Sequence, residues 1–188
     1  MTAGPGVTAD LVPGAYVEWH PVPPPYGPRE QSAAGRQAAS AALAAAGSAD
    51  RTVPRASDGR PCFPRGFPGS IAHTDHLAVA VVVPGAAAVG VDIEVAVVTP
   101  RVAGFVLRER ERRTLLPPAG QYSPRELFCA KEAAFKALDG TGVEDGLLFW
   151  RIELTHIGDG LVASYGAASV PVWVRSEEGL SFAVAVRR

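Results

Sequence analysis

Lysine and cysteine are both scarce in this chain, where each occurs twice among 188 residues. Two cysteines are too few for the disulfide framework of a small secreted domain, and no apolar run reaches the roughly 18–20 residues that a membrane span requires. The first ten residues also lack the basic start and apolar core of a signal peptide. We therefore expect a cytoplasmic protein with reduced thiols and no membrane partner.

The chain also lacks an excess of charge of either sign, because 18 basic and 19 acidic side chains give a formal net charge of −1. This balance provides no long-range attraction to the phosphate backbone, so nucleic acid is not an expected partner. Apolar residues make up 47% of the sequence, which is enough for a substantial buried core. Any recognition of phosphate must then come from local groups of residues.

Helical and extended patterns follow one another in an irregular order. An alanine-rich segment at 29–46, followed by Gly47, predicts a helix with a glycine stop, after a proline-rich loop at 21–28. Two valine-rich segments separated by Pro84-Gly85 predict a strand, a turn and a second strand. The expected strands are 77–83, 88–95, 147–157, 161–165, 170–175 and 180–186. This order is typical of an α+β fold rather than of alternating βαβ units.

The best-defined helix begins after Ser123. Ser123 can be its N-cap, Pro124 suits the first helical position, and Glu126 completes a capping box. The run LFCAKEAAFKAL follows, and we expect the helix to end near Asp139-Gly140. One or two shorter helices are expected within 101–116, before two consecutive prolines.

Two acidic residues stand at the end of the strand predicted at 88–95, in the sequence Gly-Val-Asp-Ile-Glu. The period-two geometry of a strand places Asp92 and Glu94 on the same face, opposite Val91 and Ile93. Two ionised carboxylates side by side require a cation between them, and an all-oxygen site favours Mg²⁺ or Mn²⁺ over zinc. The alternative is that the strand simply ends and leaves two acids in solvent, and the pattern alone leaves both interpretations open.

The helix after Ser123 carries an acid and a base on one flank. At 100° per residue, Glu132 and Lys136 lie about 40° apart beside an apolar stripe. Such a pair on an exposed helix contributes about 0.3–0.5 kcal/mol and needs no function. However, Lys131 and Lys136, on either side of Glu132, are the two lysines among 18 basic residues. Their retention in an arginine-rich chain favours a functional site.

Three blocks of sequence occur in a distinctive order. The first combines Pro61-Cys62-Phe63-Pro64-Arg65-Gly66 with Gly69-Ser70-Ile71-Ala72-His73. The second is the Gly-Val-Asp-x-Glu strand, and the third is Phe-Cys-x-Lys-Glu-x-x-x-Lys at 128–136. With Ala34-Gly35-Arg36 upstream, these blocks together resemble the 4′-phosphopantetheinyl transferases of the surfactin and enterobactin synthetase type over residues 34–138.

The resemblance implies two similar α+β halves related by pseudo-two-fold symmetry. It also implies transfer of the phosphopantetheine arm of coenzyme A to a serine of an acyl or peptidyl carrier protein, with release of adenosine 3′,5′-bisphosphate. Asp92, Glu94 and Glu132 would hold Mg²⁺, or Mn²⁺, against the pyrophosphate. Asp92, Glu132 and Lys136 would be the catalytic residues, with Glu132 accepting the serine proton and Lys136 contacting the pyrophosphate.

Contacts to the rest of coenzyme A are also implied by the resemblance. Arg36, with Arg29 on preceding turns of the same helix, and His73 occupy the family's phosphate and adenine positions, and arginine suits phosphate because it donates two parallel hydrogen bonds. A solvated arginine on a helix is an equally good explanation for Arg29. The alternative for His73 is a core or turn histidine whose ring nitrogens form hydrogen bonds with the backbone. The remaining expected coenzyme A contacts are Arg60, Ser70, Lys131 and Lys136.

The chain departs from the family pattern on the adenine side. Phe63 stands where many relatives have tryptophan, which keeps an aromatic surface and loses the indole donor. Asp58 precedes Gly59 at a position that is commonly basic, so Arg55 or Arg60 could supply the missing charge. Cys129 occupies a position where relatives have small residues, and we interpret it as a packing residue rather than a nucleophile.

The segment 108–113 contains four arginines and two glutamates. A solvated helix face explains this composition. The alternative is an electrostatic guide for a carrier protein, because carrier proteins are acidic and complementary charge accelerates association.

The resemblance places the coenzyme A 3′-phosphate and adenine on an N-terminal half, 1–87, and the metal and catalytic helix on a C-terminal half, 88–188. A weak internal repeat of Ala-Val-Ala-Val at 78–81 and 183–186 is compatible with two related halves. We expect a monomer that binds coenzyme A in the cleft between the halves. Two rival functions stay open, namely another metal-dependent phosphoryl-transfer or phosphohydrolase enzyme acting on a nucleotide-like substrate, and a non-catalytic binding module braced by a metal.

Overall fold

The computed structural model describes residues 11–139, 147–177 and 179–188, and these form two antiparallel sheets. The first sheet has the strand order β1-β3-β2 and the second has the order β4-β8-β7-β6-β5. The strands are β1 (Tyr16–Pro21), β2 (Gly69–His73), β3 (Leu77–Val82), β4 (Ala88–Glu94), β5 (Glu153–Ile157), β6 (Gly160–Tyr165), β7 (Ala168–Glu177) and β8 (Leu180–Arg187). The predicted α+β class is confirmed.

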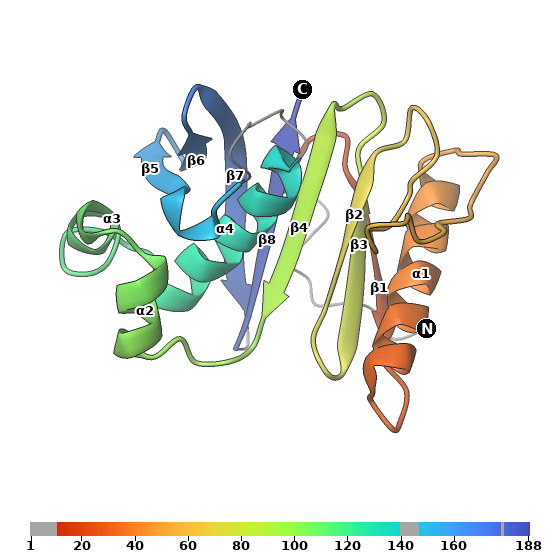
Figure 1. Ribbon diagram of the computed structural model, residues 1–188, viewed down its shortest axis with the longest axis horizontal. Helices are drawn as coiled ribbons and strands as arrows, with labels where there is room; N and C mark the ends of the chain where they lie inside the picture. Colours follow the sequence, from red (N-terminus) through yellow and green to blue (C-terminus); the bar gives the residue numbers. More distant parts are fainter. Residues whose placement is uncertain (1–10, 140–146, 178) are drawn as a thin grey trace.

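Helices cover the outer faces of both sheets (Figure 1). They are α1 (Pro28–Ala45), α2 (Pro100–Val106), α3 (Glu109–Thr114) and α4 (Pro124–Leu138), and a 3-10 turn, η1, spans Phe149–Arg151. The predicted capping box is present, since Ser123 Oγ accepts a hydrogen bond from Glu126 N (3.2 Å) and the Glu126 carboxylate accepts one from Ser123 N (2.7 Å). Helix α4 ends with Asp139 as its C-cap, while Gly140 lies outside the described residues.

Three local predictions differ from the structure. Strand β2 was not expected from the sequence pattern around residues 69–73. The segments before and after Pro84-Gly85 are strands, but they do not pair with one another, because β3 pairs with β1 and β2 whereas β4 pairs with β8. The strand predicted at 147–157 begins at Glu153, because the preceding residues form η1.

Alternating side chains divide the molecule into four layers, a helix, two sheets and a second helix. Val79 and Val81 of β3 and Phe182 and Val184 of β8 pack into one apolar cluster between the sheets. The intervening residues face outward, so that Ala80 of β3 packs beneath α1, and Ala183 and Ala185 of β8 pack beneath α4. The two sheets therefore share a core, and each helix has a further core of its own.

Both halves of the chain use the same connectivity, which is a strand, a helix and then an antiparallel pair of strands. In the first half these elements are β1, α1, β2 and β3, and in the second the corresponding elements are β4, α4, β7 and β8. The repeated Ala-Val-Ala-Val sequence lies in β3 and β8, and each of these strands pairs with a neighbour on both sides. This arrangement is consistent with two similar halves.

Gly90 of β4 allows α4 to lie directly on the strand. A Cβ at Gly90 would stand 1.9 Å from the carbonyl oxygen of Ala133 and 2.9 Å from Ala137 N, both of which belong to the helix backbone. A backbone cannot move aside as the end of a flexible side chain can, so any other residue would displace the helix. The contact therefore fixes the distance between the acidic end of β4 and the flank of α4.

Replacing Gly90 with alanine should lower the free energy of unfolding by about 1–3 kcal/mol through overpacking. Urea denaturation measures this change. Gly160→Ala is the matched control in β6, because its Cβ would meet its nearest neighbour at an ordinary 3.6 Å. Equal stabilities of the two variants would contradict the role assigned to Gly90.

Candidate active site

Asp92 and Glu94 lie on one face of β4, as the period-two pattern predicted, and this face meets α4. Val91 and Ile93 are buried in the core between the sheets, whereas Asp92 and Glu94 lie on the opposite face and are partly buried. Lys136 of α4 reaches this face, where its Nζ donates to Asp92 Oδ1 (2.9 Å) and to the Val91 carbonyl (2.7 Å). The helix thus places an ammonium group on the first carboxylate of the predicted site.

Glu132, one turn before Lys136, lies in the same electrostatic environment. Burial raises the pKa of Glu132, and the charges of Asp92 and Glu94 raise it further, while Lys136 opposes them. The pKa of Asp92 is also raised, by burial first and to a smaller extent by Glu94, against the effect of Lys136. Because α4 lies directly on β4 at Gly90 and Lys136 pairs with Asp92, the carboxylates of β4 and α4 share one side of the molecule.

The donor chemistry of this group suits a hard divalent cation. All three carboxylates supply oxygen ligands, and a cation among them would relieve the like-charge repulsion that, after burial, raises the pKa of Glu132. Within the described ranges, the side chains of His, Cys, Asp and Glu form no ready-made cluster of three metal ligands. The Lys136 ammonium neutralises Asp92 in this arrangement, and Glu94 Oε1 accepts a hydrogen bond from Ala96 N (2.7 Å).

The first sheet contributes His73, at the end of β2. Loss of hydration lowers the pKa of His73, and Lys136 lowers it further, while the charges of Asp75 and Asp92 act in the opposite direction. Since Lys136 and Asp92 belong to the second half of the chain, the imidazole stands where the two halves meet. The histidine that the sequence pointed to is therefore an element of the same neighbourhood as the acids.

A cavity of about 290 Å³ opens beside His73. Arg36 of α1 and Arg55 of the following loop line it, and both guanidinium groups donate to the hydroxyl of Ser32, at 2.7 Å and 3.3 Å respectively. Gly35 lets α1 approach β2, because a Cβ there would meet Ile71 Cγ2 at 2.7 Å. Two arginines converging on one hydroxyl form a site that suits a phosphate.

Comparisons with known families agree with this geometry. The sequence model of the 4′-phosphopantetheinyl transferase N-terminal domain matches residues 28–83, and that of the 4′-phosphopantetheinyl transferase superfamily matches residues 88–186. The chain belongs to this superfamily. No curated protein matches the chain at a significant level. Membership means that the protein is a transferase that moves phosphopantetheine from coenzyme A to a carrier protein.

Three residues predicted to bind coenzyme A lie outside the cavity wall. Arg29 is exposed on α1, and the cavity begins at its neighbour Pro28. Ser70 is buried within β2. Arg60 is held by two carboxylates, those of Asp58 and Asp139. The structure instead brings Arg55, which was the alternative to Arg60 for the missing basic charge, into the wall of the cavity.

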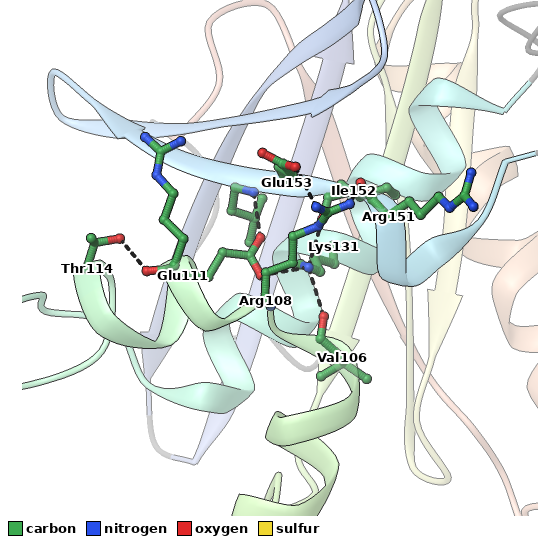
Figure 2. A network of polar contacts seen from close by, with 10 residues as sticks. Val106, Arg108, Glu111, Thr114, Lys131, Arg151, Ile152 and Glu153 are labelled. Carbon is green, nitrogen blue, oxygen red and sulfur yellow. Dashed lines mark hydrogen bonds and ion pairs between the residues drawn. The ribbon is translucent and has the colours of Figure 1, made fainter.

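Lys131 does not reach the site of the transferase. Its ammonium has no exposed surface and donates to the carbonyls of Val106 and Ile152, each at 2.8 Å, and to Glu111 Oε2 at 2.8 Å (Figure 2). Because all three donors of the ammonium are occupied inside the second half, the structure does not support the predicted contact with coenzyme A. Lys131 instead fixes α4 to α3 and to the segment before β5.

Glu111 completes this network and was not singled out by the sequence. Although it belongs to a run of charged residues, it is 2% exposed. Its Oε1 accepts a hydrogen bond from Leu154 N (2.7 Å). Its Oε2, which also contacts Lys131, accepts one from Arg108 N (2.6 Å). The segment 108–113 therefore has a solvated side and, at Glu111, a buried side. The burial of Glu111 could have been predicted only from its position in the helix.

Cys129 of α4 contacts the backbone of the acidic strand β4. Its thiol is buried and donates to the carbonyl of Asp92 at 3.2 Å. Burial raises the pKa of Cys129 well above its usual range, so the side chain stays a neutral thiol. This environment agrees with the interpretation of Cys129 as a packing residue.

Removing Lys131 should destabilise the transferase strongly, because Glu111 would remain as an unpaired buried charge. We expect Lys131→Met to lower the free energy of unfolding by about 3–5 kcal/mol, as measured by urea denaturation. Lys131→Met combined with Glu111→Gln should lose less, because the uncompensated charge is gone. Arg113→Met removes an exposed cation of the same region as a control. A double variant less stable than Lys131→Met would contradict this account.

Proposed function

We propose that this transferase is of the surfactin and enterobactin synthetase type and depends on Mg²⁺, with Mn²⁺ as a substitute. The observation that carries the proposal is the position of His73. It lines the arginine-bearing cavity and also interacts electrostatically with Lys136 and Asp92. A single extended substrate with phosphates at two places, such as coenzyme A, suits a cationic cavity whose His73 lies in the electrostatic neighbourhood of an acidic site.

Coenzyme A would lie with its 3′-phosphate between Arg36 and Arg55. Both guanidinium groups already point to one position, marked by the Ser32 hydroxyl, so little reorganisation is needed when a phosphate binds there. His73 would contact the adenine end of the nucleotide. Arg29 and Ser70 remain weaker candidates, because the former is exposed on α1 and the latter is enclosed in β2.

Asp92, Glu94 and Glu132 would hold the divalent cation. When bound, the cation would neutralise charge on the pyrophosphate oxygens and help to align them with the serine hydroxyl. The three residues fit this role because they supply oxygen ligands, and because a cation would offset the effect by which Asp92 and Glu94 raise the pKa of the buried Glu132.

Glu132 and Lys136 would assist the transfer itself. The serine oxygen forms a bond to the phosphorus next to the pantetheine arm, and the bond from that phosphorus to adenosine 3′,5′-bisphosphate breaks. Glu132 accepts the serine proton, and Lys136 leaves Asp92 to contact the pyrophosphate oxygens on which negative charge increases. The partial exposure of Lys136, at 31%, allows its ammonium to reach a substrate.

The carrier protein would approach over α2 and α3. Phe105 and Trp150 are 76% and 58% exposed, and both line a hollow whose rim includes Arg112. Arg110 and Arg113 are exposed nearby, whereas Arg108 is engaged by Glu153 and by the Arg151 carbonyl. The exposed Glu109 also lines the hollow, but the arginines outnumber it. An apolar patch with a mainly cationic rim suits an acidic domain of the kind that carries phosphopantetheine.

We also propose that the protein acts as a monomer in the cytoplasm. One chain supplies both the cationic cavity and the acidic site. Cys62 and Cys129 are free thiols, as expected of a reducing compartment. Among the described residues, no helix is both long and apolar enough to cross a membrane.

The decisive assay incubates the protein with coenzyme A, Mg²⁺ and an apo carrier protein, and measures carrier mass. A gain of one phosphopantetheine is expected, and fatty-acid, polyketide and nonribosomal-peptide carriers tested in parallel reveal the pathway served. Removing the metal with a chelator should abolish the gain, and Mg²⁺ or Mn²⁺ should restore it. Hydrolysis of coenzyme A with an unmodified carrier would instead support a phosphohydrolase.

Glu132→Gln should reduce transfer by a factor on the order of 10²–10⁴ and leave the fold intact. The physical reason is that the amide neither accepts the proton nor carries charge for the metal. Thermal melting checks the fold, and Glu177→Gln, at an exposed position of β7, is the matched control. A stability loss with unchanged transfer would mean that Glu132 only stabilises the fold and takes no part in the reaction.

Replacing Arg110, Arg112 and Arg113 by glutamine should raise the KM for the carrier several-fold and leave the KM for coenzyme A unchanged. The effect should shrink as ionic strength rises, because exposed charges are screened. A control with the same change of charge replaces the exposed residues Arg51, Arg175 and Arg188. Equal effects on both KM values would remove the proposed steering role.

A further inference from the structure

Arg60 connects the coenzyme A cavity to the end of the catalytic helix. Its Nε and Nη2 contact Asp58 Oδ2 at 2.7 Å and 2.6 Å, within the same loop. Its Nη1 pairs with the carboxylate of Asp139. Asp139 is the C-cap of α4, the helix that carries Glu132 and Lys136. One guanidinium thus joins a loop of the first half to a helix of the second.

The loop that Arg60 holds forms one wall of the cavity. Pro54, Arg55, Gly59 and Pro61 all line the cavity. The loop closes on itself, because Cys62 N donates to the Pro54 carbonyl and Ala56 N donates to the Arg60 carbonyl, each at 2.8 Å. A movement of Arg60 would therefore shift the wall, including the guanidinium of Arg55.

Asp58 presets the direction of the Arg60 side chain. Its Oδ1 accepts a hydrogen bond from Arg60 N at 3.0 Å, while its Oδ2 accepts one from Arg60 Nε. The hydrogen bond from the guanidinium lowers the pKa of Asp58, so the carboxylate is ionised. The acid that replaces the family's usual basic residue therefore orients an arginine toward Asp139.

We propose that Arg60 is a positioning residue that clasps the cavity loop to the end of α4, and that it does not bind coenzyme A directly. The inference rests on the proposed function, because the ligand of the cavity is taken to be coenzyme A. All three nitrogens of the Arg60 guanidinium contact carboxylates, so the group would have to break these contacts to bind a phosphate. The clasp instead keeps Arg55 in place and couples the cavity to the helix that carries the catalytic residues.

The test measures the dissociation constant of coenzyme A by calorimetry for Arg60→Gln, Asp139→Asn and the double variant. Exposed ion pairs are weak, so each single change should raise the dissociation constant by about two- to fivefold. The double variant should bind no more weakly than Arg60→Gln alone, since Arg60→Gln already breaks the contact that Asp139→Asn removes. Asp139→Glu, which keeps the charge, should restore most of the affinity.

The affinity of Asp139→Asn for coenzyme A distinguishes a positioning role of Arg60 from direct binding of a phosphate by Arg60. If Arg60 bound a phosphate, removing the carboxylate would free its guanidinium, and coenzyme A would bind equally well or more tightly. That result would overturn the inference. Asp159→Asn, in the turn between β5 and β6, is the control for the loss of one exposed carboxylate and should leave the dissociation constant unchanged.

Steady-state kinetics give a second measurement. The clasp predicts a higher KM for coenzyme A in Arg60→Gln and Asp139→Asn, with an unchanged KM for the carrier. An increase for the carrier alone would overturn the inference. If the unaltered protein neither binds coenzyme A nor modifies any carrier, the proposed function itself is wrong. If it does both while Asp139→Asn behaves as the parent, only the clasp is wrong.

Discussion

The site depends on one close contact, in which the backbone of α4 rests on β4 where Gly90 has no side chain. This contact brings Glu132 and Lys136 within electrostatic reach of Asp92. The carboxylates come from a strand and a helix that are separated by more than thirty residues of sequence. Without the contact, Glu132 would lie apart from Asp92 and Glu94, and the effect of these two acids on its pKa would be absent.

The two lysines of the chain serve opposite purposes although they lie on the same helix. Lys136 is partly exposed and pairs with a carboxylate at the edge of the site, so a substrate can displace that pairing. Lys131 is enclosed, and burial lowers its pKa against the opposing effect of Glu111. Its three hydrogen bonds make it a fixed part of the scaffold, which holds α3 and the segment before β5 against the catalytic helix (Figure 2).

The sequence predicted those features that depend on local geometry. The period of β4 placed Asp92 beside Glu94, and the capping box located the start of α4. It could not predict that β3 and β4 belong to different sheets, because a Pro-Gly turn says nothing about the partner of either strand. It also could not separate Lys131 from Lys136, or Arg55 from Arg60. In each case the outcome depends on partners such as Glu111 or Asp139, which only the folded chain brings near.

The apolar layer between the sheets has a consequence for the dynamics of the whole molecule. Because Val79 and Val81 of one sheet pack with Phe182 and Val184 of the other, neither sheet can lose its structure without exposing the core of its neighbour. The two halves should therefore melt as one cooperative unit, and the central amides of β3 and β8 should exchange with solvent only through global opening. The same layer opposes large hinge motions between the sheets, so we expect adjustments to an incoming nucleotide to occur in the loops at its rim.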